Sequence, residues 1–209
     1  MEQSEEGNPP RNWLYADSAD FRQAVVDCLK KIAEVIAEDS GSDLQKSKYR
    51  ILRYLDFQLA RAACFIEADV DLMAAVMRNL IELRFWAKFV VESSENATQF
   101  LNEHDIDTKE LAELLMKIPG EGSSWSEMPS IEGKRVKVQQ CGDMEKWTWK
   151  LCSKLIHPSS FMINQFDHRL RDPVILRILA LQVVQYGLEI VSIFNHAASE
   201  LAPGNLNEP

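Results

Sequence analysis

Apolar residues recur every three or four positions through long segments of this chain, which is the period of an amphipathic α-helix. Residues 18–38 show it clearly, with a stripe at Phe21, Val25, Cys28, Leu29, Ile32 and the pair Val35 and Ile36. No segment gives a convincing strand. The sequence therefore predicts an all-α fold: a single helical bundle of about five long helices.

Helix boundaries are indicated by residues that cap helix ends. Ser42 and Gln45 form a capping-box pattern, and Asp172 followed by Pro173 is a strong start signal. Residues 71–93 are apolar on most sides, so they are expected at the centre of the bundle. The predicted helices cover residues 18–38, 43–68, 71–93, 107–118, 143–157 and 173–201, with a shorter piece over 97–103.

A chain of 209 residues fits one domain with tails. We predict a disordered N-terminal tail over 1–12, one bundle domain over 13–202 and a flexible C-terminal tail over 203–209. A long irregular loop, 119–142, precedes the helix that ends at His157. Loops of this length are often functional.

Charge and composition exclude some functions. A net charge of −9 argues against general nucleic-acid binding, although an acidic body can still carry a small basic site. The acidic N-terminus is not a secretory signal. The four cysteines, Cys28, Cys64, Cys141 and Cys152, are expected to be reduced, buried or half-buried thiols of a cytoplasmic protein.

The most apolar segment, residues 173–194, carries Arg177, Gln182, Gln185 and Glu189. We interpret it as a buried helix rather than a membrane span. Three of these polar groups belong to a regular polar stripe: Gln182, Gln185, Glu189, Ser192, His196 and Ser199. The stripe is either the solvated edge of the helix, the lining of a polar cavity or a symmetric helix contact. Gly187 beside it would let another helix approach closely.

The best candidate for chemistry is a histidine at a helix end. Trp149, Ser153 and His157 stack on one helical face, and Pro158 stops the helix. The carbonyl end of a helix favours a protonated imidazole, so His157 could titrate near neutral pH as a general acid or base. Alternatively, its ring only caps carbonyls or bonds to Ser153. Residues placed to bind an anion nearby are Lys150, Lys154, Ser159 and Ser160, with Trp149 and Ser153 on the same helix.

Arg78 and Glu82, spaced four residues apart, can meet on the central helix. Their neighbours are small and aromatic, so the pair is either a partly buried part of a site or an ordinary ion pair beside the solvent face. Arg84, Lys88 and Glu92 are assigned to that solvent face.

Motifs for metals and nucleotides are not evident. There is no HExxH, no paired ExxH and no Cys/His cluster, and His104 and His168 have no partner spacing. There is also no Walker A loop, GxGxxG or GxSxG motif. We therefore expect no metal and no cofactor.

Two short motifs, Arg78-Asn79-Leu80-Ile81-Glu82 and Ser153-Lys154-Leu155-Ile156-His157-Pro158-Ser159, resemble an uncharacterised group of bacterial all-helical proteins distantly related to HEPN domains. By helix order the resemblance covers about residues 20 to 200. HEPN domains are helical bundles, commonly dimeric; many are metal-independent ribonucleases of toxin–antitoxin and phage-defence systems, and others only bind. The active ones use an Arg, four to six residues and a His. Here His157 fits the second position, and Lys150 is the one basic residue at the first.

Two functions follow from these observations. The first is a HEPN-like interaction module that forms a homodimer and binds RNA, a nucleotide or a protein partner, in a bacterial defence or toxin–antitoxin setting and without a membrane. The alternative is a metal-independent endoribonuclease with His157, Lys150, Arg78 and Glu82 as catalytic residues. A third reading, ranked last, is a small-molecule pocket lined by the polar stripe.

Overall fold

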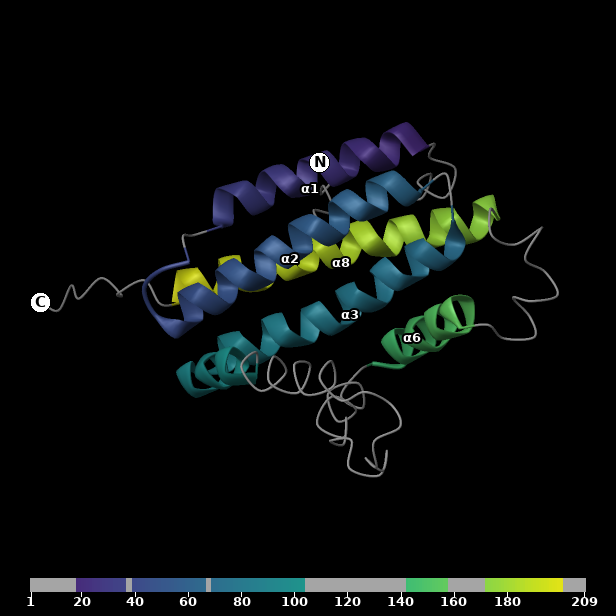
Figure 1. Cartoon of the computed structure of the whole chain (residues 1–209). Helices are drawn as coiled ribbons and strands as arrows, with labels where there is room; N and C mark the ends of the chain where they lie inside the picture. The colour runs from purple at the N-terminus through teal and green to yellow at the C-terminus, as the bar shows by residue number, and fades with distance from the viewer. Residues whose placement is uncertain (1–17, 37–38, 67–68, 104–141, 158–171, 201–209) are drawn as a thin grey trace, which may run out of the picture.

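The computed structural model describes residues 18–36, 39–66, 69–103, 142–157 and 172–200 (Figure 1). Within these ranges the chain is helical and contains no strand, which confirms the predicted all-α fold. Several predictions concern residues outside the described ranges: both tails, the helix over 107–118, most of the loop over 119–142, Cys141, His104, His168, Ser159 and Ser160.

Five long helices are described, together with a short helix over residues 94–103. The long helices are α1 (Ser18–Val35), α2 (Asp43–Phe65), α3 (Val70–Glu92), α6 (Asp143–Ile156) and α8 (Pro173–Glu200). Each starts within one residue of its predicted position, because the start signals are local. The short helix begins three residues before the prediction, since its first turn, Ser94-Glu95-Asn96, is polar and gives no apolar signal.

Helix caps explain why the starts were predictable. At α2, the Ser42 N–H donates to Gln45 Oε1 (2.9 Å) and the Gln45 N–H donates to Ser42 Oγ (3.3 Å), which completes the capping box. At α8, Asp172 Oδ1 accepts from the N–H groups of Val174 (3.0 Å) and Ile175 (3.2 Å). Both devices satisfy helix N–H groups that have no partner within the helix.

The core is organised around α3, which contacts α2, α6 and α8. In Figure 1, α6 lies along one side of α3, and α1 lies on the opposite side of the bundle. The predicted central position of α3 is confirmed, because the buried residues of α3 occur on several of its faces. They are Val70, Met73, Ala74, Val76, Met77, Leu80, Ile81, Leu83, Ala87 and Val90.

Gly187 allows α8 to approach α1 and α2 closely. A Cβ atom at this position would lie 3.2 Å from Cys28 Sγ and 3.3 Å from Leu59 Cδ2. Both distances are shorter than ordinary van der Waals contact, so the absence of a side chain sets the spacing of three helices. The predicted role of this glycine is confirmed.

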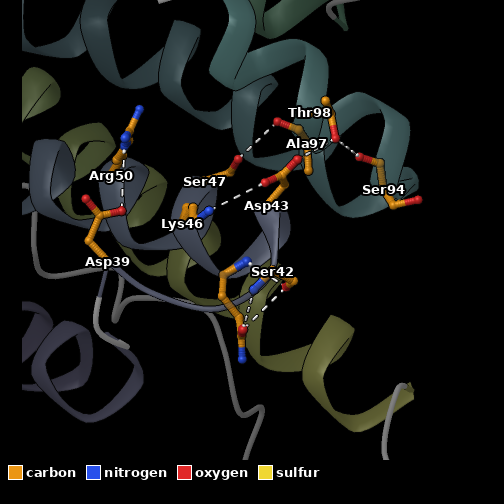
Figure 2. Close-up of polar contacts among 10 residues, drawn as sticks. Asp39, Ser42, Asp43, Lys46, Ser47, Arg50, Ser94, Ala97 and Thr98 are labelled. Carbon is orange, nitrogen blue, oxygen red and sulfur yellow. Dashed lines mark hydrogen bonds and ion pairs between the residues drawn. The ribbon is translucent and has the colours of Figure 1, made fainter.

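The N-terminal end of α2 is fastened to the short helix by polar contacts (Figure 2). The buried Ser47 hydroxyl donates to the Ala97 carbonyl (3.2 Å), and the Thr98 hydroxyl donates to Asp43 Oδ2 (2.7 Å). On the α3 side, the Trp86 and Phe100 rings pack with centroids 5.1 Å apart. These contacts hold the chain in place as it leaves α3.

α8 is long and apolar enough by composition to cross a membrane over Pro173–His196, and half of that window is buried in the bundle. Core helices of helical bundles have the same properties.

Two of the three described cysteines, Cys28 and Cys152, are buried, and burial raises their thiol pKa values to about 11 and about 12. The third, Cys64, is exposed, so the prediction of burial is wrong there.

Candidate functional site

The relative direction of α3 and α6 decides which candidate residues meet. The Arg78 guanidinium lies over the Trp149 ring, 4.2 Å from its centroid, and Arg84 pairs with Glu145. Residue numbers thus rise along α3 as they fall along α6. The helices are antiparallel neighbours, as Figure 1 also shows.

This register separates the three residues of the predicted polar site along the bundle. Arg78 is half-buried at the level of Trp149, whereas His157 follows Trp149 by eight residues, about 12 Å along the helix axis. Glu82 is exposed and lies one turn from Arg78 in the other direction. The structure therefore brings Arg78 to an aromatic ring, in a cation–π contact, and places His157 two turns away from that level.

His157 is the C-cap of α6, as the sequence indicates. Its backbone is extended (φ −83°, ψ 148°), and its N–H donates to the Ser153 carbonyl (3.2 Å). The side chain is exposed. A ligand in solution can therefore reach the His157 imidazole.

The outer face of α6 is basic and aromatic. The exposed residues of this face are Lys146, Trp147, Lys150, Lys154 and His157, and from the first to the last the sequence contains no Asp or Glu. The Trp147 side chain is 53% exposed, which is unusual for the largest apolar residue. We call these five residues the α6 face.

Sequence reasoning found part of the α6 face. It identified Lys150, Lys154 and His157, and it missed Lys146 and Trp147. The missing signal was present in the sequence: lysines recur at four-residue spacing, which places them on one side of a helix. Buried Thr148 and Cys152 mark the opposite side.

Arg84 occupies a junction of three helices, so its assignment to the solvent face is wrong. Its side chain is 18% exposed and pairs with Glu145 of α6 and with Glu189 of α8. Arg84 Nε lies 2.6 Å from Glu189 Oε2, a contact with ion-pair distance but without hydrogen-bond alignment. The guanidinium also lies 5.5 Å from the centroid of the Tyr186 ring. The pattern of α3 alone could not show these partners.

The polar stripe of α8 serves several purposes. Gln182 Nε2 donates to Thr148 Oγ1 of α6 (3.2 Å), and Gln185 Nε2 donates to Glu189 Oε1 (3.1 Å). His196 Nδ1 lies 2.8 Å from the Ser192 carbonyl oxygen, the distance of a hydrogen bond. Part of the stripe therefore faces α6 and α3 instead of forming a uniform solvated edge. The Ser199 side chain lies outside the described part.

Within the described ranges, no three His, Cys, Asp or Glu side chains are grouped so that they could hold a metal ion.

Comparisons with protein-family models, with curated proteins and with solved structures gave no match.

Proposed function

We propose that this chain is a HEPN-like helical binding module that holds single-stranded RNA on the α6 face. The observation that carries the proposal is the exposed Trp147 ring among three exposed lysines of one helix. Lysines bind phosphates as mobile point charges, and an exposed aromatic ring offers a surface on which a base can stack. The two features together are typical of proteins that bind single-stranded nucleic acid.

The magnitudes favour a modest, salt-sensitive interaction. Stacking of one base on an aromatic side chain contributes about 1–3 kcal/mol. Three phosphate contacts predict that the logarithm of affinity falls with the logarithm of salt concentration with a slope of about −2. The chain as a whole carries a net charge of −9, so RNA binding is expected to depend on local groups of exposed cations such as the three lysines of the α6 face.

The resemblance to HEPN domains supports the same partner class. It adds the expectation of a homodimer and of a role in a bacterial defence or toxin–antitoxin system. The second of the two motifs that carry it contains His157, which lies on the same face as the lysines.

A second candidate is a metal-independent endoribonuclease with His157 as its general acid or base. The exposure of His157 at the end of the basic face favours it, since Lys150 lies seven residues earlier on nearly the same side of the helix. Binding without cleavage is favoured because Arg78, the guanidinium expected to stabilise the transition state, contacts Trp149 at a level two turns from His157.

Fluorescence anisotropy with a labelled single-stranded RNA tests the binding proposal on the full chain at low salt. Trp147→Ala and Lys150→Ala should each weaken binding, whereas Lys31→Ala, which removes an exposed lysine from α1, should not. Absence of binding by the wild-type protein, or equal loss in the Lys31→Ala variant, would overturn it.

Cleavage is measured on the same RNA in the presence of EDTA. Under the binding proposal the RNA stays intact. Turnover by the wild-type protein that His157→Ala abolishes, with affinity retained, would establish the ribonuclease instead.

A further inference from the structure

α3 and α8 leave a groove between them just beyond the point where α6 begins. The two helices run in the same direction here, since Arg84 pairs with Glu189 and Lys88 lies near Ile193 one turn later. α6 covers their junction only as far as its first turn, where Glu145 reaches Arg84. The groove has a volume of about 370 Å³ and is lined by Arg84, Lys88, Glu189, Ser192, Ile193 and His196.

The groove has an apolar lining and polar groups at its edges. Most of the surface exposed inside it belongs to carbon atoms, and Ile193 is the apolar residue among those that line it. The polar groups are the Lys88 ammonium, the Ser192 hydroxyl and the His196 imidazole. This arrangement suits a ligand that has an apolar body and one polar end.

The charges at the groove indicate the sign of that polar end. Glu189, the one carboxylate among the described lining residues, pairs with Arg84, which also pairs with Glu145, so these three side chains together carry a charge of −1. Lys88 is exposed on the same wall, and its positive charge takes no part in these ion pairs. With Lys88 the charges sum to zero, but Lys88 has no ion-pair partner among the described residues, so an anionic end of a ligand is favoured at the Lys88 ammonium itself.

The walls are also held in place before any ligand binds. Arg84 is fixed from both sides by carboxylates, and the His196 ring is oriented by the Ser192 carbonyl (2.8 Å) and hydroxyl (3.2 Å). A preformed site loses less conformational entropy on binding. Its volume falls in the lower part of the range of small-molecule sites, about 300–1,000 Å³.

We propose that this groove binds a small amphipathic carboxylate, with the carboxylate at Lys88 and a short aryl or alkyl body against Ile193. The site uses none of the residues of the α6 face, so it is independent of RNA binding. It gives the polar stripe of α8 a function in its second half, at Ser192 and His196.

The test uses 4-phenylbutyrate as probe and NMR of the full chain with ¹³C-labelled isoleucine methyl groups. The Ile193 signal is assigned with Ile193→Val, from whose spectrum it disappears. We expect 4-phenylbutyrate to shift the Ile193 signal with a Kd of about 1 mM, the affinity of a small fragment. The neutral analogue 4-phenylbutanol should bind about threefold to fivefold more weakly, the change expected for one partly exposed ion pair.

Lysine substitutions test whether Lys88 is the cation that binds the carboxylate of the probe. Lys88→Ala should weaken 4-phenylbutyrate binding to the level of 4-phenylbutanol, Lys88→Arg should keep it, and Lys31→Ala on α1 should leave it unchanged. The proposal is overturned if Ile193 does not shift, if the alcohol binds as well as the carboxylate, or if Lys88→Ala binds like the wild type. A shift with inorganic phosphate but not with 4-phenylbutyrate would also overturn it, because the apolar body would then contribute nothing.

Discussion

Replacing Arg84 by methionine should destabilise the bundle far more than the loss of an ordinary surface charge. Arg84 joins three helices through two carboxylates, and the side chains of Arg84, Glu145 and Glu189 are 18%, 15% and 36% exposed. Methionine keeps much of the aliphatic volume, so the main effect is that two glutamates lose their cation.

The size of the effect follows from burial. Removing one partner of a fully buried pair costs about 3–5 kcal/mol, and an exposed pair is worth about 0.2–1 kcal/mol. Because Glu145 is nearly buried and Glu189 is partly in solvent, we expect Arg84→Met to lower the free energy of unfolding by about 2–3 kcal/mol. Most of this cost comes from the uncompensated Glu145, so adding Glu145→Gln should recover about half of it.

Urea unfolding followed by circular dichroism measures these differences. The matched control is Arg53→Met, which removes an arginine whose side chain is 60% exposed and 3.9 Å from Asp56; it should change stability by less than about 0.5 kcal/mol. If Arg84→Met costs no more than Arg53→Met, or if Glu145→Gln worsens the Arg84→Met variant, the description of a three-helix ion cluster is wrong.

Three further predictions concern the core. Gln58 is fully buried and, within the described ranges, neither amide atom has a hydrogen-bond partner, so Gln58→Met should raise the free energy of unfolding by about 1–2 kcal/mol; a loss of stability would mean that the amide has a partner such as an interior water. Gly187→Ala should lower the melting temperature despite the higher helix propensity of alanine, because its Cβ would lie 3.2 Å from Cys28 Sγ, and an unchanged or higher value would refute the close approach. Burial raises the thiol pKa values of Cys28 and Cys152 because it disfavours the thiolate, so the folded state loses stability, relative to the unfolded state, as pH rises from 9 toward about 11 to 12. The free energy of unfolding of Cys152→Ala should therefore fall less steeply with pH over this range than that of the wild type. An identical slope would contradict the burial effect.

The fold was predictable because its signals are local. The Ser42–Gln45 box and the Asp172–Pro173 start are read from a few adjacent residues, and the apolar period of α3 indicates burial on several faces without knowledge of its neighbours. The same reasoning fails where no local pattern exists, as at the polar first turn of the short helix and at exposed Cys64.

The site was less predictable because it depends on register between helices. Nothing in α3 indicates that Arg84 meets Glu145 and Glu189, which come from helices about 60 and 105 positions later in the chain. For the same reason the sequence could not show that Arg78 stands at the level of Trp149 instead of His157. The α6 face is different, since its lysine spacing is a property of one helix.

The salt dependence of RNA affinity tests the central proposal most directly. For the wild-type chain, a plot of the logarithm of affinity against the logarithm of salt concentration should have a slope of about −2, and each of Lys146→Ala, Lys150→Ala and Lys154→Ala should reduce its magnitude by about 0.7. A wild-type slope near zero, or slopes that these substitutions leave unchanged, would contradict RNA binding at the α6 face.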